Sequence, residues 1–201
     1  LDLQTGGGEV VAGAGALAPL TVVTEGWPPS LARARALLAP LGVEVVEHDG
    51  VRQLPFADGS FDLVTSRRPV STQWPEVARV LRTGGTFLSQ QGGPASGFEL
   101  IEELTGPLPP QDRERRRPEQ AALDAAAAGL TVVDLRSARL RIELFDVAAV
   151  VWLLRRLVWW VPGFTVAGYR DRLEALHRRI ERDGPFVAHS TRFLIEARRS
   201  A

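Results

Sequence analysis

The stretch Leu1-Asp2-Leu3-Gln4-Thr5-Gly6-Gly7-Gly8 decides how this chain is organised. A short apolar segment with one acid leads directly into three glycines, and a helix-compatible segment begins at Glu9. This profile is typical of a buried strand that turns through a tight loop into a helix, where backbone amides can approach a ligand closely. Three glycines are equally compatible with a plain turn, so the interpretation depends on the residues at set distances beyond the loop.

Strand and helix patterns alternate over the first 92 residues. β-branched and apolar runs predict strands, while two prolines open one of the helices, a position that tolerates them well. The expected strands are 1–3, 20–24, 43–47, 61–65 and 86–90, and the expected helices are 9–17, 30–39 and 74–81. Short connections between alternating elements predict a parallel sheet covered by helices on both faces.

The pattern changes after Gly92. Helices are expected at 98–104, 119–128 (with Gly129 as the C-terminal cap) and 166–182, and a long strand or bent pair at 130–144, with a last strand at 186–197. Residues 107–118 read as a loop, and 147–160 as a strongly apolar segment that Pro162-Gly163 ends. No internal repeat or clean domain boundary is visible, so one domain is expected over 1–201, with a helical insertion at about 146–183.

The composition limits the classes of function. An apolar share of 45% supports a sizeable core, and 24 basic residues balance 24 acidic ones, so no net field favours nucleic acid or acidic lipid. Cysteine is absent, which excludes a thiolate nucleophile and thiolate metal ligands, and we expect no metal site. No uncharged apolar run reaches the roughly 18 residues of a membrane span. We expect a soluble cytoplasmic protein from a GC-rich, bacterial genome, with a further segment upstream of Leu1.

Two acids come after the glycine loop at informative positions. Glu25 ends the second expected strand, and an acid about 20 residues past a glycine loop accepts hydrogen bonds from ribose hydroxyls in nucleoside sites. Asp49 ends the third strand and is followed by Gly50 and by the stretch 54–64, Leu-Pro-Phe-Ala-Asp-Gly-Ser-Phe-Asp-Leu-Val.

With these residues the chain resembles the class I S-adenosylmethionine-dependent methyltransferases, in the broad small-molecule group. The resemblance is strongest over residues 1–92. It rests on the glycine loop, on Glu25, on Asp49 with the Leu-Pro-Phe stretch, and on residues 79–85, Arg-Val-Leu-Arg-Thr-Gly-Gly. It implies a Rossmann-like, doubly wound α/β fold: a mostly parallel, seven-stranded sheet whose last strand is antiparallel, with a helical lid inserted before that strand.

The resemblance also implies the cofactor, S-adenosylmethionine, with S-adenosylhomocysteine as the product. Residues 1–92 would form the cofactor-binding half, and 93–201 the substrate half. The implied cofactor residues are Asp2, Thr5, Gly6, Gly7, Gly8, Glu25, Trp27, Asp49, Gly50 and Ser66. The glycines would line the methionine moiety, Glu25 would hold the ribose, and Asp49 and the Gly50 amide would face the adenine. Trp27 would either stack on the adenine or clamp the two prolines that follow it.

One position departs from the family pattern, because Gln4 stands where the family usually has glycine. A side chain there would crowd the turn or require a changed backbone, which lowers the expected affinity for the cofactor.

Candidate catalytic residues follow from the chemistry of methyl transfer. The sulfonium is already activated, so the protein must align the reacting groups, exclude water and, for some acceptors, remove a proton. An antiparallel last strand would bring its beginning to the carboxyl ends of the other strands. His189 is therefore the candidate base, with Arg67 and Gln91 at the ends of strands four and five; a structural histidine in the sheet is the competing interpretation for His189.

The acceptor is less constrained by the sequence. Trp152, Trp159, Trp160 and Phe164 lie in the insertion, where they would suit a lid over a small hydrophobic or aromatic acceptor, a dimer interface, a membrane-touching surface or plain core packing. The arginines of 113–117 could contact phosphates, although a solvated loop is favoured. The expected function is small-molecule methyl transfer. The alternatives are an RNA methyltransferase and a non-catalytic binding module, and a homodimer is compatible with each.

Overall fold

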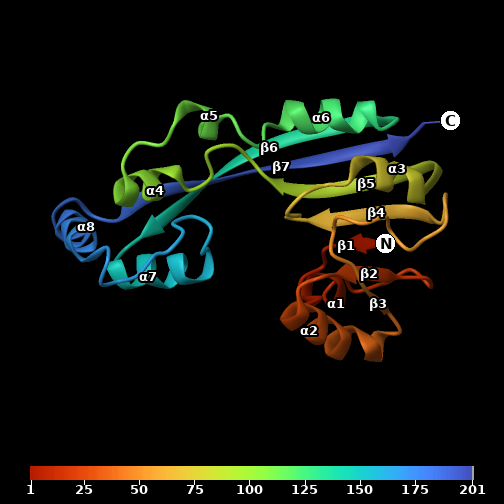
Figure 1. The fold of residues 1–201 in the computed structure, drawn as a ribbon, viewed down its shortest axis with the longest axis horizontal. Coiled ribbons are helices and arrows are strands. Elements are labelled where there is room, and N and C mark those ends of the chain that lie inside the picture. Colours follow the sequence, from red (N-terminus) through yellow and green to blue (C-terminus); the bar gives the residue numbers. More distant parts are fainter. Residues whose placement is uncertain (201) are drawn as a thin grey trace. The chain divides into compact units, whose positions relative to one another are not determined.

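The computed structural model describes residues 1–200 and contains one seven-stranded sheet of order β3-β2-β1-β4-β5-β7-β6. The strands are β1 (Asp2–Leu3), β2 (Val22–Glu25), β3 (Glu44–Glu47), β4 (Phe61–Arg67), β5 (Leu81–Gly92), β6 (Leu130–Leu144) and β7 (Phe186–Arg199). β1 to β5 pair in parallel, and Figure 1 shows β7 running against β5. The expected Rossmann-like, mostly parallel sheet with an antiparallel last strand is confirmed.

The helices follow the expected order, with local differences at α1, at α5 and in the strand β5. They are α1 (Glu9–Ala12), α2 (Pro28–Leu38), the 3-10 helix η1 (Ala39–Leu41), α3 (Trp74–Val80), α4 (Phe98–Thr105), α5 (Pro110–Arg113), α6 (Pro118–Ala127), α7 (Val147–Arg156) and α8 (Arg170–Asp183). α1 is one turn long because Gly13 ends it. α5 interrupts the expected loop, and β5 begins before the glycine pair, with a register shift opposite Phe61 and Leu63.

Backbone contacts divide the chain into two compact units. The first unit contains Leu1–Gln91, Pro118–Arg136 and the chain from Phe193 onward. The second unit contains Gly92–Arg117 and Ser137–Arg192. The units therefore interleave along the chain, whereas the sequence led us to expect halves that meet near residue 92. β6 and β7 contribute residues to both units because each strand is long.

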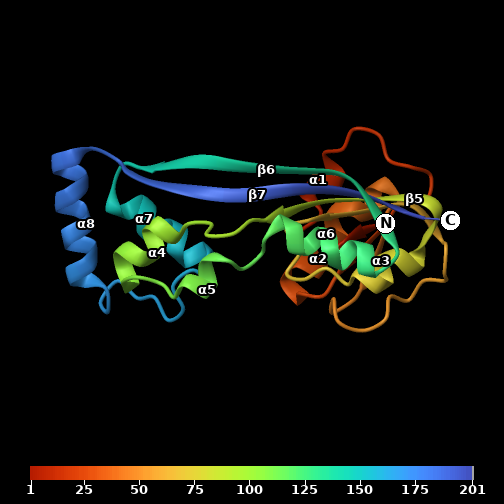
Figure 2. The ribbon, with the colours of Figure 1, turned by 90° about the horizontal axis from the view of Figure 1, so that it is seen from above.

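In the first unit, apolar side chains on both faces of the sheet pack against helices. Val23 is fully buried with Ala34 and Leu38 of α2, whereas its neighbour Val22 joins the cluster of β4, β5, α3 and α6. Successive strand residues point to opposite faces, so α1 and α2 cover one face and α3 and α6 the other. Figure 2 shows α3 and α6 on the same side of β5. The doubly wound arrangement follows directly from this alternation.

The second unit has an apolar core of its own. Leu100, Leu154 and Leu176, from α4, α7 and α8, are almost fully buried together. α7 begins at a capping residue, because the Asp146 side chain accepts a hydrogen bond from the Ala149 amide at 2.7 Å. α7 and α8 are the helical insertion expected between the last two strands.

Arg79 of α3 organises the Leu-Pro-Phe stretch of the first unit. Its guanidinium donates to the carbonyls of Leu54 and Phe56 at 2.9 and 2.7 Å, and to the carboxylates of Asp58 and Glu76. The Arg79 hydrogen bonds hold the pKa of Glu76 below its usual value, although burial opposes them, and the Leu54 amide adds a further bond. The stretch read from the sequence as a family motif is thus an anchored loop.

This network predicts an acid-dependent loss of stability. Because the pKa of Glu76 is lower in the folded chain, its contribution is complete above the unfolded value of about 4.3 and is lost as pH falls through the folded value. Glu76→Gln should therefore lower the unfolding free energy at pH 7 and flatten its decline below about pH 4.5. Urea unfolding across pH 3–7 measures this, with Glu44→Gln, on an exposed strand residue, as the control. If the unfolding free energy fell equally steeply with pH in Glu76→Gln and in the unmodified protein, Glu76 would not be the source of this acid dependence.

Candidate cofactor site

The glycine loop after β1 is built around the carboxylate of Glu25. Oε2 accepts from the Gly6 amide at 2.7 Å, and Oε1 accepts from the amides of Gly26 and Trp27 at 2.9 and 2.8 Å. Glu25 is 8% exposed, so three backbone donors satisfy a buried acid and tie the end of β2 to the loop. Glu25 therefore shapes the loop as well as presenting an acceptor.

Two of the three glycines have conformations that require glycine. Gly6 and Gly8 have φ of 67° and 85°. A Cβ on Gly8 would lie 2.9 Å from the Leu38 side chain, whereas a Cβ on Gly6 would meet no atom within 4 Å. Gly8 thus allows α2 to pack against the loop, and Gly6 leaves open space above the backbone. Gly7 lies under the ion pair of Glu9 and Arg33, whose Oε1 and Nε are 2.8 Å apart.

Asp49 lies just after β3 and is exposed. Oδ1 accepts from the amides of Val51 and Arg52, and Oδ2 accepts from Arg52 Nε at 2.8 Å. The backbone hydrogen bond from Arg52, followed by the one from Val51, lowers the pKa of Asp49 to about 2. Asp49 is therefore a carboxylate at neutral pH, and its hydrogen bonds to Val51 and Arg52 hold its side chain in place.

The amide of Gly50 is engaged differently from what we expected. It donates to Nδ1 of His48 at 3.0 Å, while His48 Nε2 lies 3.0 Å from the Arg52 carbonyl. Because Nδ1 accepts from the amide, the proton on the neutral ring is assigned to Nε2. His48 is 6% exposed and holds the loop that presents Asp49, so the Gly50 amide faces His48 rather than a ligand.

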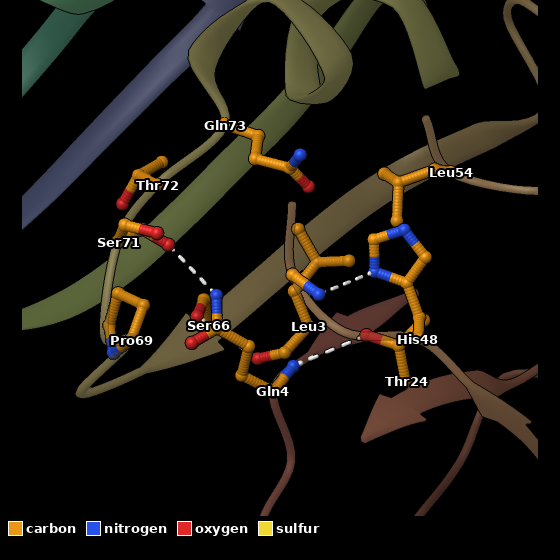
Figure 3. A pocket seen from close by; sticks show the side chains of 11 residues that line it. Leu3, Gln4, Thr24, His48, Leu54, Ser66, Pro69, Ser71, Thr72 and Gln73 are labelled. Carbon is orange, nitrogen blue, oxygen red and sulfur yellow. Dashed lines mark hydrogen bonds between the residues drawn. The ribbon is translucent and has the colours of Figure 1, made fainter. Parts of the chain in front are cut away.

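A small cavity of about 10 Å³ lies beyond the ends of β1, β2 and β4 (Figure 3). Its lining residues are Leu3, Gln4, Thr24, His48, Gly50, Leu54, Ser66, Pro69, Ser71, Thr72 and Gln73. Figure 3 shows the Gln4 side chain reaching across to Ser71, with Ser66 beneath it. Ser66 is buried and donates to the Leu3 carbonyl at 3.0 Å. Ser66, in β4, and Gln4, which directly follows β1, thus lie together at the cavity.

The remaining predicted cofactor residues lie apart from this cavity. The Asp2 carboxylate accepts from the Thr65 hydroxyl at 2.6 Å, and burial raises the pKa of Asp2. The Thr5 amide donates to the Thr24 carbonyl, which ties the loop to β2. Trp27, two residues after Glu25, is 65% exposed. Clamping of the two prolines would bury much of this ring, so its exposure favours the stacking role.

The predicted catalytic residues belong to different units. Arg67 is exposed at the end of β4, and Gln91, in β5, donates to the Thr72 hydroxyl at 3.1 Å; both residues are in the first unit. His189 is in the second unit, where its Nδ1 lies 2.8 Å from Glu99 Oε1 and 2.9 Å from an Arg139 nitrogen. Burial raises the pKa of Glu99, but its hydrogen bonds with its own amide, His189 and Arg139 outweigh burial and leave the pKa below its usual value.

Sequence reasoning missed two residues that shape these sites. Glu99 orients His189 across 90 positions of the chain, and Gln73 donates to the carbonyls of Val51 and Arg52 at 2.6 and 3.0 Å. Neither residue lies in a motif, and each acts through contacts formed only in the folded chain. No local signal could have identified them.

The acceptor chemistry of the acids fits an adenosyl group. An ionised carboxylate offers about four acceptor positions. Glu25 uses three of them on backbone amides, and Asp49 uses three on Val51 and Arg52. Each acid therefore retains one acceptor position for a hydroxyl or amino group, and the backbone of Gly6 is open to close approach. Residues 1–200 contain no group of three or more side chains able to hold a metal ion.

Comparison with known proteins gives a family match over part of the chain and a likeness of fold over all of it. Residues 1–89 match the family described as "Methyltransferase domain", and no curated protein matches the chain. The whole chain superimposes on a provisionally assigned methyltransferase of Bacillus halodurans, with a TM-score of 0.70, 20% identity and 91% of that chain covered. YcgJ of Bacillus subtilis gives a TM-score of 0.67 at 18% identity, again over 100% of this chain and 91% of the other.

A third structure was solved with ligands bound. It is the Haemonchus contortus phosphoethanolamine N-methyltransferase 2 in complex with phosphomonomethylethanolamine and S-adenosylhomocysteine. The TM-score is 0.56 at 17% identity, and this chain covers 48% of that protein while being covered completely itself. At these identities the three likenesses establish the fold, and the substrates remain those of the proteins named.

Proposed function

Because residues 1–89 match the methyltransferase domain family and the chain has the class I methyltransferase fold, we propose that this protein transfers a methyl group from S-adenosylmethionine to a small, hydrophobic or aromatic acceptor. The observation that carries the proposal is the pair of acids, Glu25 and Asp49, at the ends of neighbouring strands β2 and β3. Each acid is anchored by backbone amides, and each keeps one acceptor position free.

In this proposal the chain's own residues bind and orient the cofactor. Glu25 accepts from a ribose hydroxyl, Asp49 accepts from the adenine amino group, and the exposed Trp27 ring stacks on the adenine. The loop 6–8 lines the amino-acid end, and Ser66 lies near the reacting centre. The sulfonium of the cofactor supplies an activated methyl group, so binding and alignment are the main demands on the protein.

Proton removal falls to His189 when the acceptor requires it. Glu99 Oε1 and an Arg139 nitrogen both lie within hydrogen-bond distance of His189 Nδ1, so Nδ1 is engaged and Nε2 is the ring nitrogen proposed to accept the proton. Arg67 and Gln91 are proposed to contact the acceptor. Glu99 acts through His189 and is a positioning residue.

The acceptor class rests on the aromatic insertion of the second unit. Trp152 and Trp159 are 57% and 64% exposed, whereas Trp160 and Phe164 are packed against the core of that unit. Exposed aromatic rings suit an apolar acceptor better than a highly charged one.

The arginines of 113–117 give little support to an RNA substrate. Arg113, Arg115 and Arg117 each pair with a nearby acid, namely Glu102, Asp112 and Glu114. Local pairing leaves fewer free cations for phosphates.

Calorimetric titration with S-adenosylmethionine and S-adenosylhomocysteine tests the proposal. We expect saturable binding of both compounds with one site per chain. A chain that binds neither compound, while remaining folded by circular dichroism, would exclude the enzyme and favour a binding module that keeps only the fold. Strongly salt-dependent RNA binding would favour the RNA alternative.

A further inference from the structure

The cavity beside Gln4 lies at the topological switch point of the sheet. In the order β3-β2-β1-β4-β5, the chain builds outward on one side from β1 and on the other side from β4. Ligands of open α/β sheets bind outside the carboxyl ends of the strands at such a point. Gln4 follows β1, and residues 68–73, which we call the strap, follow β4. These two segments border the crevice.

Glutamine side chains hold the strap on three sides. Gln4 Nε2 donates to the Ser71 carbonyl at 2.8 Å, and Gln4 Oε1 accepts from the Val70 amide at 2.8 Å. Gln91 donates to Thr72, and Gln73, at the end of the strap, donates to the Val51 and Arg52 carbonyls. The strap is thereby tied to the ends of β1 and β5 and to the loop after β3.

The Gln4 bonds span the crevice itself. The cavity that remains is about 10 Å³, roughly the volume for one water, whereas small-molecule sites measure about 300–1,000 Å³. Ser66 and Gly50, two of the predicted cofactor residues, line this cavity, so a ligand that reaches them requires the strap to move. Glu25 and Asp49 each follow a lining residue in the sequence, Thr24 and His48. Figure 3 shows Gln4 as the side chain that reaches from β1 toward the strap.

Two features make the Gln4 contact easy to break. Both of its hydrogen bonds are exposed to solvent, where water competes for donor and acceptor, and the Val70 side chain is 88% exposed instead of packed. Gln4 also has a φ of 54°, in a region that residues other than glycine rarely adopt. The strap is thus held closed at this point by the two Gln4 hydrogen bonds, and the Val70 side chain adds little apolar packing.

We propose that Gln4 is a latch that closes the strap over the switch-point crevice, and that S-adenosylmethionine binds only after both Gln4 bonds break. The inference rests on the proposed function. Ligand binding then requires the open population, and the apparent dissociation constant is raised in inverse proportion to that population. The bonds of Gln73 and Gln91 retain the far end of the strap while residues 69–71 move.

Hydrogen exchange at the Val70 amide tests the latch without any ligand. Gln4→Ala removes both side-chain bonds and should accelerate Val70 exchange by about tenfold or more, since the amide loses its acceptor. Gln4→Gly also relieves the positive φ and should exchange at least as fast. Gln53→Ala, on an exposed residue of the neighbouring loop, is the matched control and should leave Val70 unchanged. Unchanged Val70 exchange in both Gln4 variants overturns the latch.

Calorimetry with S-adenosylhomocysteine tests the consequence. Gln4→Ala and Gln4→Gly should bind about tenfold more tightly than the unmodified chain, with equal thermal stability confirming that the fold is intact. Binding by these variants alone also supports the latch. Weaker binding would mean that Gln4 contacts the ligand directly, and equal binding with faster Val70 exchange would mean that the strap does not control access; either result overturns the proposal. Absence of binding in every variant, with normal folding, instead removes the cofactor assignment.

Discussion

Glu25→Ala should lower the affinity for S-adenosylhomocysteine by about 5- to 150-fold, the loss expected when a buried hydrogen-bonding partner is removed. The side chain accepts from three backbone amides and is the proposed partner of the ribose. The substitution removes that partner and also releases the Gly6 amide, which sets the shape of the glycine loop. Calorimetric titration measures the change.

A second acid separates ligand contact from damage to the loop. Asp49→Asn alters an exposed side chain, so the fold should be retained while affinity for S-adenosylhomocysteine still falls clearly. Glu47→Ala serves as the control, because Glu47 pairs in register with Glu25 but is exposed on β3. Unchanged affinity in the Glu25 and Asp49 variants, both folded, would place the cofactor elsewhere.

Phe87→Ala should destabilise the first unit by about 3–5 kcal/mol, through lost burial and the cavity left behind. Phe87 is fully buried in β5 and packs edge-on against Trp74 of α3, with ring centroids 5.4 Å apart. Phe87 and Trp74 lie where the sheet packs against α3. The surrounding side chains therefore cannot easily fill the cavity that the substitution leaves. Guanidinium unfolding followed by tryptophan fluorescence measures the loss.

The adjacent residue provides the matched comparison for this change. Leu88 follows Phe87 on the same strand but points to the other face and is 37% exposed. Leu88→Ala should therefore lower the unfolding free energy by less than half as much as Phe87→Ala. Similar losses for the two variants would show that strand propensity, rather than core packing, dominates at this position.

The amino-acid sequence alone was sufficient to predict how strands and helices succeed one another along the chain, because the cause is local. Apolar runs of strand length, the prolines that open α2 and the glycines that end helices depend on neighbours within a few residues. The places of Glu25 and Asp49 at strand ends were predictable for the same reason: Glu25 is the last residue of β2, and Asp49 lies two residues after β3. Their role toward a cofactor stays a prediction. The short helix expected at 9–17 is shorter still, because it ends at Ala12 with Gly13 as its C-terminal cap.

Other features depend on residues that are distant in the sequence. Gly50 looked like a ligand-facing amide until the fold placed the His48 ring against it. Glu99 became the partner of His189 only because the start of α4 lies beside β7. The division into two interleaved units likewise has no boundary signal, since β6 and β7 contribute to both.

Gln4 shows most clearly where the two kinds of information separate. The sequence alone determined that an amide side chain stands at a position where the methyltransferases that the chain resembles usually have glycine. It could not determine what that side chain contacts, because Val70 and Ser71 lie more than 60 residues away and meet Gln4 only when β1 and β4 pair side by side. Tertiary structure therefore decided that Gln4 bridges the crevice, since hydrogen bonds between distant segments depend on how the strands are ordered in the sheet.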